Sequence, residues 1–290
     1  MAAGAPLARP LDVRWIHGSP SAKHNTDPDI QVHAYDEHTV ILRQNKAVNY
    51  EAPFLFLLFG AERAVLIDTG ATASAAYFPL RTVVDGLIDQ WLARYPRNPH
   101  KARDGYGLLV LHTHPHGDHV AGDAQFADRP DTTLVAADPA TAWPYFGFDQ
   151  DPDAVARVDL GGGRALECLA TPGHHPAAVT YYDPWTGLLL TGDTVYPGRL
   201  YIDDWPAFTR TIDRLIDFAE RRPVTHLLGC HIEMTRTPGV DYPIRTTHQP
   251  DEPPLQLTVG HLRAIRTALA DLGDRPRRHA LPDLILWPSA

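Results

Sequence analysis

The sequence predicts an α/β (α+β) protein, because strand-like and helix-like segments are mixed along its whole length. Short apolar runs such as Phe54 to Phe59 are followed by turn residues, which is typical of buried strands. Leu80 to Tyr95 carries apolar residues at helical spacing. No low-complexity linker divides the 290 residues. We therefore expect a single domain over residues 1–290, with a core from about 30 to 273, an N-terminal extension and a C-terminal helix and tail.

The N-terminal half predicts a hairpin, strands and one helix. The hairpin falls where β-branched and polar residues mix, and a turn at 60–62 separates the next two strands. The helix ends at the breakers Pro96 and Pro99. The predicted elements are a hairpin over Val32 to Leu42, strands Phe54 to Phe59 and Ala64 to Ile67, a helix Leu80 to Tyr95 and a strand Leu108 to Leu111.

The C-terminal half repeats this mixture of elements. Apolar runs again predict strands, and the longer amphipathic segments predict helices. The predicted strands are Thr133 to Ala136, Ala165 to Ala170, Val179 to Tyr182, Leu188 to Leu190, Thr225 to Gly229 and Leu284 to Trp287. The predicted helices are Pro206 to Arg221 and Leu255 to Leu272.

Charge and composition limit the classes of partner. A net charge of -9 opposes binding to nucleic acid, which needs clustered Lys and Arg. The longest apolar run, Phe54 to Phe59, is too short to cross a bilayer. Cys168 and Cys230 are the two cysteines, so we expect no disulfide framework and a cytoplasmic location. We expect a small-molecule substrate, no nucleic acid or membrane partner, and a homodimer as the working oligomeric state.

Residues 113–119, with the sequence T-H-P-H-G-D-H, follow the predicted strand Leu108 to Leu111 and are the most informative motif. On an extended segment, residues i and i+2 point to the same side, so His114 and His116 can bind one ion. Asp118 and His119 then face a second ion. Imidazole and carboxylate ligands together suit zinc, iron or manganese. The alternative for this motif alone is a histidine-rich surface loop.

Three further motifs each place one candidate ligand just beyond an apolar strand. They are Pro172-Gly173-His174, Gly192-Asp193 and Gly229-Cys230-His231. Loops at strand ends are where a rigid scaffold holds functional groups. The ordered combination therefore predicts a metal site assembled from several loops.

The string T-H-x-H-x-D-H, followed by P-G-H, G-D and a late G-x-H, resembles the metallo-β-lactamase fold hydrolases. The resemblance runs from about Phe54 to His231. It implies an αββα four-layer sandwich with two metal ions between the sheet edges. It also implies that Asp68 supports one of the ligands. The implied ligands are His114, His116 and His174 for the first metal, and Asp118, His119 and His231 for the second, with Asp193 bridging them.

Two divalent ions, most simply zinc, with iron or manganese as alternatives, can share a bridging water and lower its pKa toward about 7. The resulting hydroxide is the predicted nucleophile. Asp118 can orient the water and pass a proton to the leaving group.

Asp193 stands where many β-lactamases of this fold have Cys, which resembles the branch of hydroxyacylglutathione hydrolases and lactonases. Lactonases of the superfamily carry a tyrosine at the position of Tyr196, which can bond a substrate oxygen; packing beside the metals is the alternative role. The predicted activity is hydrolysis of a thioester or lactone. The alternatives are a β-lactamase-like amide hydrolase and a mononuclear iron dioxygenase of the same superfamily.

Two regions are predicted to shape the substrate pocket. In the segment from Tyr196 to Trp205, Arg199 either clamps an acidic substrate or is a solvated surface charge. The segment from Glu233 to Pro254 predicts an irregular lid.

Residues 44–53 predict a flap, with Tyr50 and Glu51 as its candidates for the active site or, alternatively, ordinary packing. His112, Thr113 and His175 flank ligands, and we expect them to orient imidazoles or to act only locally.

Overall fold

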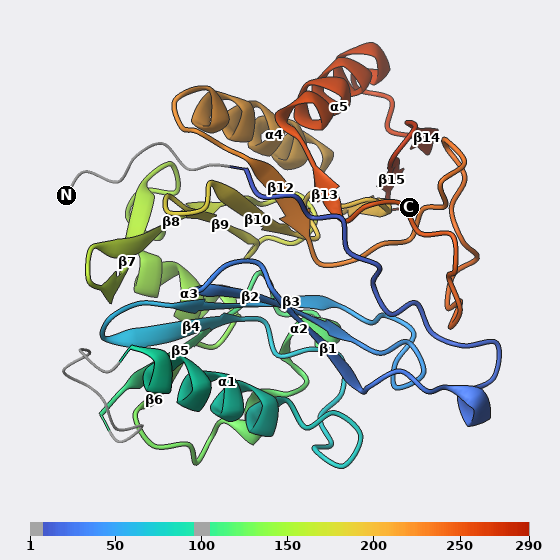
Figure 1. The fold of residues 1–290 in the computed structure, drawn as a ribbon. Coiled ribbons are helices and arrows are strands. Elements are labelled where there is room, and N and C mark those ends of the chain that lie inside the picture. The colour runs from blue at the N-terminus through green and yellow to red at the C-terminus, as the bar shows by residue number, and fades with distance from the viewer. Residues whose placement is uncertain (1–7, 96–104, 290) are drawn as a thin grey trace.

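Two six-stranded β-sheets pack face to face, and helices cover the outer face of each (Figure 1). This computed structural model describes residues 8–95 and 105–289. The layers follow the order helix, sheet, sheet, helix, so the predicted αββα sandwich is confirmed.

The first sheet has its strands in chain order. The pairs from β1 to β4 are antiparallel, whereas β4, β5 and β6 run parallel. Its strands are β1 (Ile30–Ala34), β2 (Thr39–Gln44), β3 (Phe54–Phe59), β4 (Arg63–Ile67), β5 (Gly107–Leu111) and β6 (Thr132–Leu134).

The second sheet has the order β13-β12-β10-β9-β8-β7, with β10 and β12 parallel. A third, three-stranded sheet has the order β11-β15-β14. The strands of the second sheet are β7 (Val155–Gly161), β8 (Arg164–Ala170), β9 (Val179–Asp183), β10 (Leu188–Gly192), β12 (His226–Gly229) and β13 (Gln256–Leu257). Those of the third are β11 (Arg199–Ile202), β14 (His279–Ala280) and β15 (Ile285–Pro288).

The helices pack on the outside of the sheets or connect strands. In Figure 1, α1 lies below the first sheet, and α4 and α5 lie above the second. The helices are α1 (Leu80–Arg94), α2 (Gly117–Val120), α3 (Pro139–Phe146), α4 (Trp205–Glu220) and α5 (Val259–Leu272), with short 3₁₀ turns at Ala22–His24 and Asp123–Gln125.

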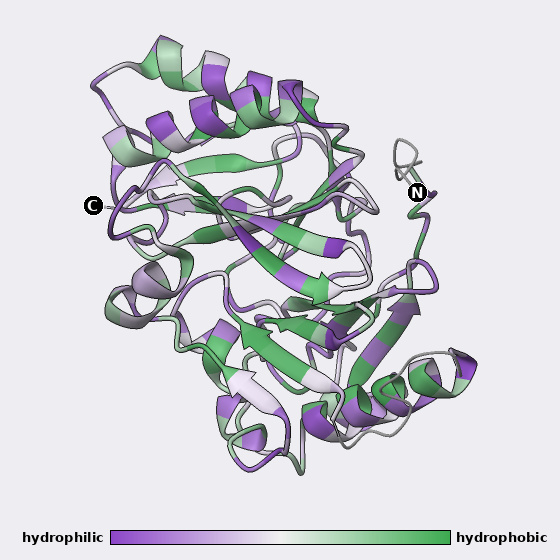
Figure 2. Ribbon diagram, turned by 90° about the vertical axis from the view of Figure 1, so that its left-hand side faces the viewer, coloured by the Kyte–Doolittle hydropathy of each residue, from purple (hydrophilic) through white to green (hydrophobic). Residues whose placement is uncertain are grey.

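Strand β3 has an uninterrupted apolar sequence because both of its faces are buried. Phe54, Phe56 and Leu58 belong to the cluster between the two sheets. Leu55 and Leu57 belong to the cluster beneath α1, together with residues of that helix. Because successive side chains of a strand point to opposite faces, burial of both faces requires apolar residues throughout. Figure 2 accordingly shows largely hydrophobic strands between helices that alternate hydrophobic and hydrophilic residues.

Several sequence-based boundaries need correction. The predicted helix from Leu255 begins only at Val259, because residues 256–257 pair with β12 as β13. The strand predicted at Thr133 to Ala136 lies at 132–134. The segment after Tyr196, for which no element was predicted, contains β11, which pairs with the C-terminal β15. Pro96 and Pro99 lie outside the described residues.

The sequence analysis did not predict α2, α3, β7, β11, β13 or β14. Among the described residues, no helix is both long and apolar enough to span a membrane.

The topology brings the candidate ligands to one edge of the sandwich. β4 and β5 run parallel and end just before Asp68 and the histidine motif. In the second sheet, β8, β10 and β12 point the same way and end just before His174, Asp193 and His231. Loops from the carboxyl ends of both sheets therefore meet at this edge.

Candidate metal centre

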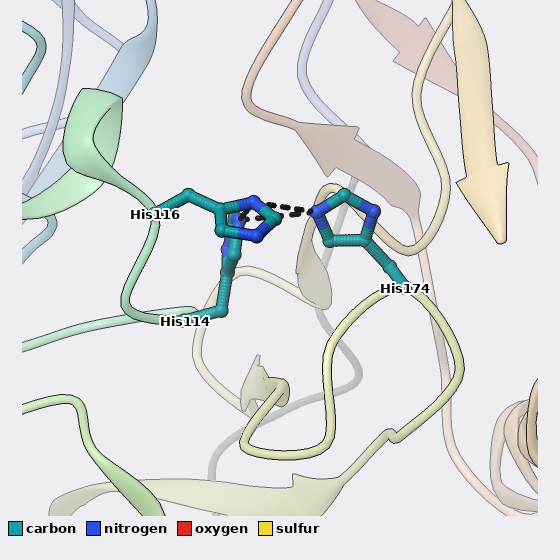
Figure 3. A group of neighbouring side chains, drawn as sticks. All are labelled: His114, His116 and His174. Carbon is teal, nitrogen blue, oxygen red and sulfur yellow. Dashed lines mark hydrogen bonds between the residues drawn. The ribbon is translucent and has the colours of Figure 1, made fainter. Parts of the chain in front are cut away.

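Three imidazoles form the first group at this edge. His114 Nε2 lies 3.0 Å from His116 Nδ1 and 3.2 Å from His174 Nε2, and the third pair of nitrogens, in His116 and His174, is 3.1 Å apart. His114 and His116 come from one loop and His174 from another, and their rings point toward one another (Figure 3). The three nitrogens thus converge as a set of metal ligands would.

Two carboxylates and two imidazoles form the second group, which consists of Asp118, His119, Asp193 and His231. Asp118 Oδ2 lies 3.2 Å from His231 Nε2 and 3.4 Å from His119 Nε2. The side chain of His119 is fully buried, whereas that of Asp118 is 21% exposed. Asp118 therefore forms the solvent-facing side of this group.

Asp193 lies between the two groups. Its Oδ2 is 3.8 Å from His174 Nε2 and 4.0 Å from His114 Nε2 in the first group. The same oxygen is 3.6 Å from His119 Nε2 in the second. Its Oδ1 is 3.4 Å from His231 Nε2. The structure thus brings together all seven residues that the sequence analysis selected as ligands.

Hydrogen bonds on the far side of the rings determine which nitrogens face the site. The Nδ1–H groups of His174 and His231 donate to the backbone carbonyls of Tyr201, at 2.8 Å, and Glu51, at 3.1 Å. His119 Nδ1 donates to the Asp68 carboxylate at 2.8 Å. In its neutral form, each ring then presents the lone pair of its Nε2 to the site. This is how metal-binding imidazoles are usually oriented.

Buried polar atoms of the site that lack a hydrogen-bond partner could bind cations. His119 Nε2 and Asp193 Oδ1 are buried and have no hydrogen-bond partner among the described residues. Burial and the neighbouring imidazoles hold the pKa of His114 well below its usual range. Converging ring nitrogens beside buried carboxylate oxygens need a positive charge between them. The donor set of nitrogen and oxygen fits zinc, iron or manganese.

The carboxylates dominate the electrostatics of the second group. Although burial opposes its charged form, Asp193 and Asp118 raise the pKa of His231 to about 9. Burial also opposes charge on His119, yet Asp68, Asp193 and Asp118 raise its pKa well above the usual value. Protons on these rings therefore compensate the negative charge, and bound cations would replace them.

Asp68 connects the ligands to the scaffold, as the resemblance implies. Its carboxylate accepts hydrogen bonds from the backbone N–H and hydroxyl of Thr113, at 2.7 and 2.8 Å, besides the one from His119. The buried thiol of Cys230 lies 3.4 Å from the same carboxylate. The backbone of Asp68 is left-handed, with φ of 65°, a region that aspartate adopts more readily than most residues. The carboxylate is held against His119 by their hydrogen bond.

Tyr196 packs beside the metal centre, with its ring 5.6 Å from that of His231. Its hydroxyl is buried and donates to the backbone carbonyl of Arg199, and the Glu233 carboxylate lies 3.3 Å away. In this conformation the hydroxyl is turned toward those groups. The catalytic role of Tyr196 stays a prediction.

Arg199 is not a solvated surface charge, so that interpretation was wrong. Its side chain is 3% exposed and binds Glu233 at 2.6 Å and Asp241 at 2.9 Å. It also donates to the carbonyl of Tyr242. These bonds attach the irregular segment 233–254 to β11, beside His174.

The residues that flank the ligands differ in their contacts. Thr113 lies within hydrogen-bonding distance of His114 and His119, so it helps to orient both rings. His112 is buried, with Nε2 3.2 Å from Asp123. Burial opposes its charge, but Asp123 and Asp68 raise its pKa to about 9. His175 accepts a bond from the backbone N–H of Ala177, a local contact.

Comparisons with known proteins show the family to which the chain belongs. Residues 52–231, more than half of the chain, match the family described as the metallo-beta-lactamase superfamily. The chain is 30% identical over 153 residues to a hydroxyacylglutathione hydrolase of Rhizobium meliloti (strain 1021). The aligned residues cover 51% of this chain and 53% of that protein. The match thus spans about half the length of that relative. The acyl-coenzyme A thioesterase MBLAC2 of Bos taurus is 28% identical over 217 residues, covering 61% of this chain and 72% of that protein.

Solved structures share the fold at low sequence identity. A metallo-beta-lactamase from Pontibacter korlensis has a TM-score of 0.50 and 17% identity, covering 83% of this chain and 99% of that one. The DIM-1 metallo-beta-lactamase exposed to ceftazidime has a TM-score of 0.51 and 13% identity, covering 86% of this chain and 100% of that one. These structures show the fold, and the family match shows the family. The chain belongs to the metallo-beta-lactamase superfamily.

Proposed function

We propose that this protein is a dinuclear metal-dependent hydrolase that cleaves an ester-like bond, a thioester or a lactone, in a small molecule. The position of Asp193 carries the proposal, because its Oδ2 is within 4.0 Å of ring nitrogens from both ligand groups. A carboxylate between two sets of ligands is suited to bridge two ions.

The first ion would be held by His114, His116 and His174, and the second by Asp118, His119 and His231, with Asp193 shared. When bound, the ions would supply a nucleophilic hydroxide at neutral pH and polarise the substrate carbonyl. The partly exposed Asp118 would orient the attacking water and pass a proton to the leaving group. Asp68 and the backbone carbonyls of Glu51 and Tyr201 would fix the orientation of the imidazole rings through hydrogen bonds to Nδ1.

The relatives support an ester-like substrate. Hydroxyacylglutathione hydrolase and acyl-coenzyme A thioesterase are named for thioester cleavage, at about 30% identity or less to this chain. Zinc as the metal, a cytoplasmic location, a homodimeric state and the absence of nucleic-acid or membrane partners belong to the same proposal. Within the family, amide hydrolysis and iron-dependent dioxygenation are the competing reactions.

A panel of thioesters, lactones, β-lactams and phosphodiesters tests the reaction class. We expect wild type to turn over a thioester or a lactone, and His116→Ala to lose that turnover because a ligand of the first group is removed. Rates are measured after incubation with zinc, iron or manganese. Activity only on β-lactams, or oxygen consumption without hydrolysis, would reject the ester-like proposal.

A further inference from the structure

Ala52, in the flap formed by residues 44–53, has a backbone conformation that two local preferences disfavour. Its φ is 44°, in the left-handed region, where the Cβ of an L-residue crowds a neighbouring carbonyl oxygen. It also precedes Pro53, and a proline directs the residue before it toward extended conformations. The residue is 1% exposed, so this conformation belongs to a packed part of the protein rather than to a turn in solvent.

Ala52 differs from the other non-glycine residues that have positive φ in the described part of the chain. Asp68 and Asp131 are aspartates, which enter this region more readily because their short polar side chains can bond locally. Arg245 is exposed. Ala52 has neither a polar side chain nor contact with solvent. Its surroundings therefore impose the conformation, and an imposed conformation of this kind is often found at functional sites.

Two hydrogen bonds, one on each side of Ala52, join the flap to the loop that carries His231. The backbone carbonyl of Glu51 accepts from His231 Nδ1 at 3.1 Å. The backbone N–H of Phe54 donates to the carbonyl of Cys230 at 2.8 Å. Because Cys230 and His231 are adjacent, the short segment between Glu51 and Phe54 has to reach both partners at once. The left-handed turn at Ala52 thus accompanies the contact that orients His231.

Buried side chains fix the rest of the flap. The side chain of Gln44 accepts from the backbone N–H of Ala71 at 2.9 Å. The side chain of Asn49 donates to the carbonyl of Ala71 at 2.9 Å and accepts from the backbone N–H of Glu51 at 3.0 Å. These bonds restrain the chain directly before Ala52. An unfavourable backbone conformation persists only where neighbouring contacts determine it in this way.

We propose that Ala52 is a positioning residue for the second ligand group, because its turn directs the carbonyl of Glu51 to His231 Nδ1. The Nε2 of that ring then faces the carboxylates of the same group. The inference rests on the dinuclear centre of the proposed function and goes beyond it, since it couples the conformation of the flap to metal binding at His231. Such coupling is reciprocal: a flap that closes more readily strengthens metal binding at His231, and metal binding there slows opening of the flap.

Ala52→Gly and Ala52→Val change the cost of the turn in opposite directions. Glycine adopts positive φ freely, whereas a β-branched residue tolerates it least. The dissociation constants of both zinc ions are measured by competition with a chromophoric chelator, and the constant of the second group is the one lost in His231→Ala. For that constant we expect binding about three- to tenfold tighter in Ala52→Gly and about tenfold weaker in Ala52→Val. The constant of the first group should not change.

Asp131→Gly is the matched control. Asp131 has φ of 52° and is exposed, and its described contacts include none of the ligands. This variant removes a left-handed side chain elsewhere, so both zinc constants should equal those of wild type. If Ala52→Val does not fold, Ala52→Gly decides. Second-group zinc binding in Ala52→Gly that is no tighter than in wild type, or an equal change in both constants, would overturn the inference.

Hydrogen exchange of peptides from residues 44–53 measures the reciprocal effect without turnover. Zinc should slow exchange of the flap in wild type about tenfold, and the metal-free flap should exchange more slowly in Ala52→Gly than in wild type. A flap whose exchange responds neither to zinc nor to Ala52→Gly contradicts the coupling. Binding of fewer than two zinc ions by wild type counts against the proposed dinuclear function instead, and the exchange rates then decide on the role of Ala52.

Discussion

Replacement of Asp118 by alanine is expected to lower kcat by about 10³-fold while the fold is kept, because the variant loses the group that we propose orients the water and moves the proton. The carboxylate lies 3.2 Å from His231 Nε2 and is 21% exposed, so it stands where solvent reaches the ligands. Its removal leaves the core untouched. The measurement is kcat on the best substrate of the panel, with circular dichroism to verify folding.

A surface carboxylate provides the control for this variant. Asp213 is exposed on α4, away from the site, and Asp213→Ala should keep wild-type turnover. Metal content has to be measured in parallel, because Asp118 also belongs to the second ligand group. Wild-type rates in Asp118→Ala would remove this residue from the mechanism.

Replacement of Asp193 by alanine is expected to lower both metal content and activity, with kcat/KM reduced by about 10³-fold or more. Its carboxylate is the group that faces ring nitrogens of both ligand groups, at 3.4 to 4.0 Å. Without it, the imidazoles lose the negative charge that lies between the proposed ions. Elemental analysis after gel filtration and steady-state kinetics on the same sample measure the two effects.

Thermal unfolding distinguishes this result from a general loss of structure. Asp193 is 7% exposed and follows β10 rather than lying inside a strand, so its replacement should leave the sheets intact. A folded Asp193→Ala that retained the full metal content of wild type would show that this residue does not bridge.

The ligands could be predicted from sequence because each follows an apolar strand. His114, Asp193 and His231 are positioned by local rules: a buried run ends and a polar side chain comes next. The family motif then assigned them to two groups, and the structure places the side chains accordingly. The same local rules located β3 and α1 to within one residue at each end.

Features that depend on distant partners could not be predicted. β11 was not predicted, because the strand with which it pairs, β15, lies at the other end of the chain. Arg199 looked like a surface charge because its partners Glu233 and Asp241 are 34 and 42 residues away. The burial of Lys46, which is 3% exposed, gave no sequence signal, since residues 46, 50 and 51 meet the distant segment 243–249. The sequence therefore predicts the candidate ligands, which follow local rules, better than it predicts contacts between distant segments.

The metal content of wild-type protein tests the central claim most directly. The protein is expressed in medium supplied with zinc, iron and manganese, purified without chelators, and measured by elemental mass spectrometry against protein concentration. The two ligand groups predict about two divalent ions per chain. A single ion per chain would contradict the dinuclear site, and only trace metal would contradict the metal-dependent mechanism altogether.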